Sequence, residues 1–197
     1  YEIFKKLEFK NMLGRFEEDT AASGTTDIAA GHETVFDFVK VEEIFEKASK
    51  SEVIGFDCLF DKGEILGVSV ALGMEGLYFI PVNGFVTREY LRERCRDINK
   101  NGIISTCDVK HQYDLFDDEN PERFFDVVLA AYLLNPLKND YGFSDVASEY
   151  LGINVLTEKE LFGKEDPGRA YSSDAAKVSK YICTKACIAL KAYGILK

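Results

Sequence analysis

The residues EVIGFDCL, at positions 52–59, decide the fold class of this chain. They open as an apolar β-strand and reach a carboxylate at Asp57, and the residues FDKG at 60–63 then indicate a turn. Side chains alternate across a strand, so Asp57 and Leu59 are predicted to point to the same face of a sheet. An Asp-x-Glu triplet in this place would direct two carboxylates at one metal site. Leucine occupies the second position here, so the strand offers a single carboxylate.

Further elements on both sides of this strand predict an α/β domain with a mixed central sheet. Short turns join successive strands between residues 53 and 82 into an antiparallel meander, and helices interleave with the strands that follow. Thr87 is expected to cap the helix that follows it. The predicted strands are residues 34–39, 53–57, 64–72, 77–82 and 102–106. The predicted helices are residues 41–48, 88–100, 108–116, 124–134, 143–151 and 174–193.

The first 33 residues are predicted to stand apart from this domain, which we place at residues 34–197. Residues 1–16 carry large apolar side chains at helical spacing, which predicts an amphipathic helix. Residues 17–33 are small, polar and glycine-containing, which indicates a flexible linker. The chain starts at Tyr1 and not at a methionine, which suggests a piece of a longer polypeptide.

Composition and charge limit the classes of function that this chain can have. The chain has 197 residues, enough for one domain with a substantial core. Its 24 Lys and Arg against 34 Asp and Glu give a net charge of −10, and such a surface repels phosphate backbones, which disfavours a dedicated nucleic-acid binder. Five cysteines without a C-x-x-C pair fit buried free thiols in a reducing compartment. The longest apolar runs are too short for a bilayer and no signal peptide opens the chain, so we expect a cytoplasmic location.

The order of segments resembles the 3′–5′ exonuclease domain of bacterial family A DNA polymerases, the DNA polymerase I type. The resemblance covers essentially the whole chain and implies a ribonuclease-H-like fold. Residues 1–16 are similar to the segment that leads out of the 5′ nuclease domain in such polymerases. The other residues that carry the resemblance are 53–59 at motif I, CDVKHQ (107–112) at motif II, FDVVLAAYLLNP (125–136) and YICTKA (181–186) at motif III.

The resemblance implies a site of four carboxylates that hold two divalent ions, which activate water and stabilise the leaving oxygen. Asp57 stands at the first carboxylate position, and Leu59 replaces the glutamate of motif I. Aligned without gaps, motif II has Gln112 in place of its aspartate. Motif III keeps Tyr181 but has Lys185 in place of its aspartate. One ligand position of four is retained, and a single Asp cannot hold two hard cations, which each prefer several oxygen ligands.

Two hypotheses follow for this site. Tyr181 and Lys185 are four residues apart on a helix and share a face. At the motif III position that the resemblance gives it, the Lys185 ammonium would lie near the vacated metal site, and it is expected to pair with Asp57. The opposite hypothesis is that displaced carboxylates rebuild a metal site, with Asp61, Asp108 and Asp114 as the residues near the motif positions. Asp61 is expected on the wrong side of a turn, and Asp114 is expected to face elsewhere on its helix. A shifted motif II register would make Asp114 the ligand, but Leu59 and Lys185 would still leave that site short of carboxylates.

Other polar residues are interpreted as structural. Asp126, in the first turn of its predicted helix, is expected to complement the helix dipole. His111 has no Ser or Cys nucleophile identifiable beside it, so a structural or solvent-exposed role is favoured over catalysis. The residues YSSD at 171–174 are predicted to cap a helix through Ser172 or Ser173.

The resemblance therefore implies a catalytically inactive, exonuclease-like domain of a bacterial DNA polymerase I that supports the polymerase domain structurally. No cofactor is expected for this chain, while Mg²⁺ is expected for the parent polymerase. Expected partners are the polymerase and 5′ nuclease domains of the same parent chain, with DNA reached through the polymerase, no membrane, and a monomeric state. Two alternatives remain: a working exonuclease with a rearranged carboxylate site, and a module that binds single-stranded DNA, which the acidic balance disfavours.

Overall fold

A six-stranded mixed sheet forms the centre of the domain in the computed structural model, which describes residues 27–116, 120–137 and 141–197. The strand order is β1-β4-β3-β2-β5-β6. β2, β3 and β4 pair antiparallel as predicted, while β5 pairs parallel with β2, β6 with β5, and β1 with β4. The strands are β1 (Glu33–Thr34), β2 (Val53–Asp61), β3 (Glu64–Ala71), β4 (Leu77–Pro81), β5 (Ile103–Thr106) and β6 (Phe124–Asp126).

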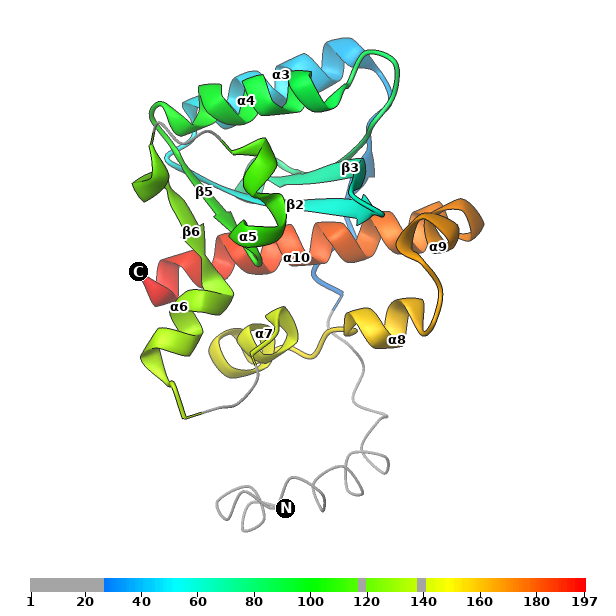
Figure 1. Cartoon of the computed structure of the whole chain (residues 1–197). Coiled ribbons are helices and arrows are strands. Elements are labelled where there is room, and N and C mark those ends of the chain that lie inside the picture. The colour runs from blue at the N-terminus through cyan, green and yellow to red at the C-terminus, as the bar shows by residue number, and fades with distance from the viewer. Residues whose placement is uncertain (1–26, 117–119, 138–140) are drawn as a thin grey trace.

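Helices cover both faces of this sheet (Figure 1). α3 and α4 lie side by side on one face, and the long α10 crosses the other face with α7 and α8 beyond it. The predicted α/β class with a mixed sheet flanked by helices is confirmed. The helices are α3 (Phe38–Lys50), α4 (Arg88–Asn99), α5 (Val109–Gln112), α6 (Val127–Leu134), α7 (Phe143–Leu151), α8 (Glu158–Phe162), α9 (Pro167–Ser173) and α10 (Ala175–Leu196).

Alternation along β2 divides the apolar core into two parts. Ile54 and Phe56 belong to the cluster that α3 and α4 complete, and both are fully buried. Leu59 belongs to the cluster on the α10 side, and Asp57 also contacts α10. The prediction that Asp57 and Leu59 share a face of the sheet is confirmed, because residues two apart on a strand point the same way.

α10 lies unusually close to the sheet. A Cβ atom on Gly55 would lie 2.0 Å from the Ala186 carbonyl oxygen, so only glycine permits this approach. Two buried serines then fix the helix along the sheet: Ser69 Oγ donates to the Ile182 carbonyl at 3.0 Å, and Ser105 Oγ donates to the Ala189 carbonyl at 2.8 Å. These contacts set which α10 side chains face the end of β2.

Three predicted elements differ from the structure for local reasons. Of residues 34–39 only Thr34 is in a strand, because the Asp37 side chain accepts from the Lys40 amide at 2.9 Å and starts α3 at Phe38. Residues 124–126 form β6 and not the first turn of a helix, since they pair with β5. Residues 108–116 form the one-turn α5 followed by a 3₁₀ turn at Tyr113–Leu115.

The predicted linker is wrong for its last residues. Ala29 is fully buried, His32 Nε2 lies 3.3 Å from Ser179 Oγ, and Glu33 pairs with β4. Residues 27–33 therefore pack on the domain. The predicted helix at 1–16 and the rest of the linker lie outside the described residues.

None of the described helices combines the length and the apolar character that a membrane crossing needs. α10 is the longest at 22 residues, and lysines interrupt it throughout.

Candidate functional site

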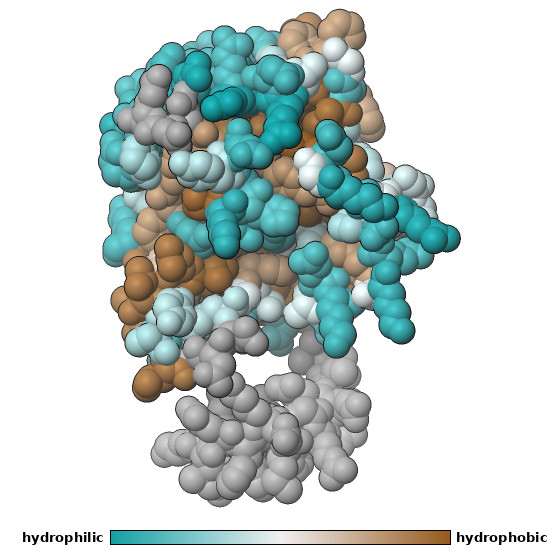
Figure 2. Space-filling model, in the orientation of Figure 1, coloured by the Kyte–Doolittle hydropathy of each residue, from teal (hydrophilic) through white to brown (hydrophobic). Residues whose placement is uncertain are grey.

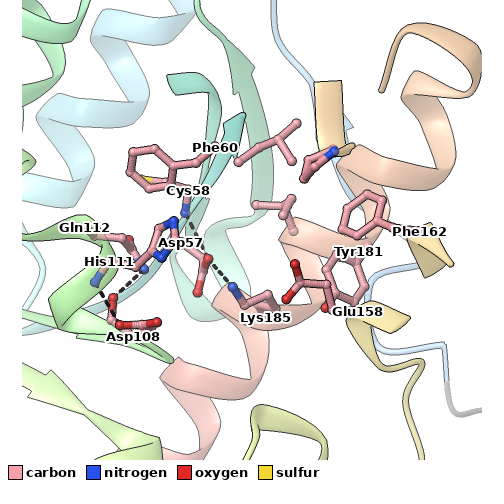
Figure 3. Close-up of a pocket in the computed structure, with 13 residues that line it drawn as sticks. Asp57, Cys58, Phe60, Asp108, His111, Gln112, Glu158, Phe162, Tyr181 and Lys185 are labelled. Carbon is pink, nitrogen blue, oxygen red and sulfur yellow. Dashed lines mark hydrogen bonds and ion pairs between the residues drawn. The ribbon is translucent and has the colours of Figure 1, made fainter. Parts of the chain in front are cut away.

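The five positions singled out from the sequence meet in one pocket beside the second half of β2 (Figure 3). β2 supplies Asp57 and Leu59, α5 supplies Gln112, and α10 supplies Tyr181 and Lys185. The pocket has a volume of about 110 Å³, below the several hundred Å³ that is usual for a small-molecule site. The tertiary structure therefore brings together residues that are up to 128 positions apart.

An ion pair between β2 and α10 occupies the centre of this pocket. Lys185 Nζ donates to Asp57 Oδ1 at 2.7 Å, and the Cys58 amide donates to the same oxygen at 3.0 Å. Asp57 is 1% exposed, and the Lys185 side chain is 19% exposed. The predicted contact between these two residues is confirmed. Asp57 Oδ2 is buried and has no hydrogen-bond partner among the described residues.

Burial and charge act against each other in this pair. Burial raises the pKa of the Asp57 carboxyl above its ordinary value, and the Lys185 ammonium opposes that rise. Burial by itself would lower the pKa of Lys185, but attraction to Asp57 outweighs it and the pKa of Lys185 is raised. Lys185 is therefore held in its charged form beside Asp57 across the neutral range.

The other motif positions hold no free carboxylate. Leu59 is 2% exposed and packs in the apolar cluster on the α10 side. Gln112 Nε2 donates to Thr106 Oγ1 at 2.7 Å and to the Asp108 carbonyl at 3.1 Å, which ties α5 to the end of β5. Tyr181 is buried between the rings of Phe143 and Phe162, and burial raises its pKa.

The displaced carboxylates divide into one that reaches the pocket and two that do not. Asp108 lines the pocket, where its side chain also caps α5 by accepting from the His111 amide at 2.8 Å. Asp114 accepts from Arg88 at 2.7 Å in a separate depression beside α4. Asp61 lies at the last position of β2, against Gly168 of α9.

The residues interpreted as structural are largely so. Asp126 is the N-cap of α6, and His111 is exposed with its ring against Phe60 at a centroid distance of 4.9 Å. The prediction for residues 171–174 is wrong in its detail. Ser172 and Ser173 end α9 and donate to carbonyls within it, and Asp174 caps α10 by accepting from the Lys177 amide.

Replacing Asp126 with alanine is expected to destabilise the domain by about 1–2 kcal/mol, because three amides lose their acceptor. Oδ1 accepts from the Val128 and Leu129 amides, and Oδ2 accepts from the Val109 amide at 3.0 Å. Urea denaturation measures the change. Asp126→Asn keeps one carbonyl-type acceptor and should lose less, so equal losses for the two variants would contradict the capping role.

One carboxylate of the pocket was not anticipated from the sequence. Glu158 lines this pocket and also the neighbouring hollow of about 480 Å³, which shares Asp108, Tyr181 and Lys185 with it. Glu158 is the first residue of the short α8, a helix that is absent from those predicted from the sequence. A signal for that helix exists in the capping box, where Thr157 Oγ1 accepts from the Glu160 amide and the Glu160 carboxylate accepts from the Thr157 amide.

The side chains at the motif positions supply one carboxylate, fewer than a site for two divalent ions needs. One Asp57 oxygen is engaged by an ammonium, and Leu59 has no donor atom. Gln112 offers only a neutral amide oxygen, since its nitrogen donates to Thr106. Across residues 27–116, 120–137 and 141–197, no group of three or more His, Cys, Asp or Glu is arranged to hold a metal ion. Two hard cations would need several oxygen ligands each.

Two solved structures share this fold. The EXO domain of Nibbler from Aedes aegypti superposes with a TM-score of 0.65 at 11% identity, covering 88% of this chain and 91% of that chain. The catalytic core of RRP6 from Trypanosoma brucei superposes with a TM-score of 0.60 at 8% identity, covering 87% of this chain and 48% of that chain. At these identities the similarity shows the fold alone. No curated protein matches the sequence.

The mixed six-stranded sheet with helices on both faces is the α/β fold that these two structures share. Residues 53–191 match the family described as DNA polymerase I, ribonuclease H-like domain. The chain therefore belongs to that family. The matched range runs from the first residue of β2 to most of α10 and includes the pocket.

Proposed function

We propose that this domain is a catalytically inactive 3′–5′ exonuclease-like domain of a DNA polymerase I that supports the polymerase domain during DNA replication and repair. The contact of Lys185 Nζ with Asp57 Oδ1 at 2.7 Å carries the proposal. A fixed ammonium on the retained carboxylate takes the place of a divalent cation. The substituted positions at Leu59 and Gln112 add no carboxylate to the site.

The role of the rest of the parent chain belongs to the same proposal. Template-directed nucleotidyl transfer with Mg²⁺ resides in the polymerase domain, a 5′ nuclease domain precedes this one, and DNA is reached through the polymerase. We place the protein in the bacterial cytoplasm. All five cysteines of the chain are free thiols and four of them are buried, as suits a reducing compartment.

The alternative is a working exonuclease with a rearranged carboxylate set. Asp108 and Glu158 line the same pocket as Asp57, and they are the carboxylates that such a site would use. Both are exposed, and Lys185 stands among them. An enzyme of this kind would have to displace the lysine before a metal could reach Asp57.

Degradation of an end-labelled single-stranded oligonucleotide separates the two functions. With Mg²⁺ or Mn²⁺, the protein is expected to release no more label than its Asp57→Ala variant. Stepwise trimming from the 3′ end that disappears in Asp57→Ala would establish a rebuilt site and overturn the proposal.

A restored variant provides the positive control. Leu59→Glu, Gln112→Asp and Lys185→Asp together place four carboxylates at the motif positions, with Asp57 as the fourth. This triple variant is expected to bind Mn²⁺ in titration calorimetry, whereas the unsubstituted domain is expected not to bind it. Circular dichroism confirms that the variant is folded before the comparison is made.

A further inference from the structure

α6 differs from the other surface helices in having no polar outer face. Its eight residues, VVLAAYLL, contain no charged side chain, and the uncharged run continues through Leu137. A helix that is apolar on all sides is normally buried on all sides. Only Val127 and Ala131 of α6 are buried here, against α7 and α10.

The outward residues of this helix form an exposed, largely apolar surface, which we call the α6 surface. Figure 2 shows hydrophobic residues gathered at the position that α6 occupies in Figure 1. The exposed fractions are far above those of ordinary core residues, at 55% for Leu129, 69% for Leu133 and 91% for Leu137. The surface is made of Leu129, Tyr132, Leu133, Leu134 and Leu137.

The C-terminal end of α10 extends this surface. The rings of Phe125, at the start of the β6–α6 segment, and Tyr193 of α10 meet edge to face with centroids 4.9 Å apart. Figure 1 shows the C-terminus beside α6, so a domain joined there would meet the α6 surface first.

Charge and size indicate what kind of partner fits. The chain has a net charge of −10, yet Tyr132 is the only ionisable side chain among residues 127–137. An apolar face of a protein can therefore dock there without burying a charge. The same lack of cations argues against DNA. An eight-residue helix is about 12 Å long, which is small for the ~800 Å² per partner of a stable association between separate molecules. A partner tethered in the same chain needs less area, because tethering raises its effective concentration to the order of millimolar.

We propose that the α6 surface is the face on which the polymerase domain of the parent chain docks. This inference rests on the proposed supporting function and names the surface that performs it. The docked domain presents an apolar patch to Leu129, Leu133 and Leu137.

Amide hydrogen exchange followed by mass spectrometry tests the surface directly. Exchange at α6 is compared between this chain, at two concentrations, and the complete parent polymerase. Slowing of at least about ten-fold in the parent polymerase alone is expected, because docking suppresses local opening of the helix. Protection at other surfaces without protection at α6 would overturn the assignment and leave the supporting role intact. Protection in this chain that grows with concentration would assign the surface to a second copy and would also overturn it.

A pair of matched variants of the parent polymerase separates docking from folding. Leu129→Glu with Leu133→Glu is expected to abolish the protection at α6. The control variant, Phe36→Glu with Val39→Glu, replaces two apolar side chains at the start of α3. Their exposed fractions, 71% and 68%, are similar to those of Leu129 and Leu133. This variant is expected to leave the protection at α6 unchanged. The oligonucleotide assay is run on the same samples, so residual nuclease activity would count against the inactive function and not against the docking surface.

Discussion

Replacing Lys185 with methionine is expected to lower the free energy of unfolding by about 3 kcal/mol at neutral pH. Removing one partner of a buried ion pair leaves the other charge without compensation, which costs ~3–5 kcal/mol in general. The lower end applies because the Lys185 side chain retains 19% exposure and water can screen part of the loss. Asp57, at 1% exposure, would keep only the Cys58 amide as its hydrogen-bond donor.

The stability lost in Lys185→Met should increase as the pH rises. Burial already raises the pKa of Asp57 in the folded protein, and the variant lacks the ammonium that opposes the rise. The folded variant therefore keeps a proton at pH values where the unfolded chain has released it. Its stability is full near the ordinary carboxyl pKa of about 4 and falls as the pH rises from there. Urea denaturation at about pH 5 and at neutral pH measures the stability lost at each pH, with the unsubstituted domain as reference.

The double variant Asp57→Leu with Lys185→Met is the matched control. An apolar pair of similar volume often replaces a buried ion pair without loss, so this variant is expected to recover most of the stability. Its denaturation midpoint should also lose the pH dependence of the single variant, since the titrating carboxyl is gone. A single variant that costs less than about 1 kcal/mol and shows no pH dependence would mean that the pair is a solvated surface contact.

Gly55→Ala is expected to destabilise the domain by at least about 3 kcal/mol, at or above the upper end of the range for overpacked cores. The new Cβ would lie 2.0 Å from the Ala186 oxygen and 2.9 Å from Leu190 Cβ, so α10 would have to move away from the sheet. That movement would also stretch the hydrogen bonds from Ser69 and Ser105 to the helix.

Urea denaturation of Gly55→Ala beside Gly84→Ala measures this effect. A Cβ at Gly84 meets no atom within 4 Å, and the backbone of Gly84 is not left-handed. The free energy of unfolding of Gly84→Ala should therefore stay within about 0.5 kcal/mol of that of the unsubstituted domain. Equal stabilities for the two variants would show that α10 does not approach the sheet as closely as the structure has it.

Much of the site could be predicted from local sequence patterns. Alternation along β2 placed Asp57 and Leu59 on one face, and helical spacing placed Tyr181 and Lys185 on another element with a shared face. The resemblance to the polymerase exonuclease domain placed Lys185 beside Asp57. Their opposite charges then predicted the ion pair between these two residues, which the structure confirms at 2.7 Å. These predictions succeed because strand and helix periods orient side chains within a few residues.

Elements whose identity depends on a distant partner were harder to predict. Residues 124–126 continue an apolar run that fits a helix equally well, and pairing of Phe124 with Ile104 makes them a strand. Short α8 has too few residues for a periodic signal, so Glu158 could not be placed at the pocket in advance.

The sequence by itself therefore determined the α/β class, the antiparallel meander, the residues at each motif position and the charge that opposes Asp57. Only the tertiary structure decided that Asp108 reaches the pocket and that α10 lies against Gly55. The physical reason is that periodicity and capping act over one or two turns of chain. The position of a carboxylate relative to a pocket depends on packing between segments that are distant in sequence.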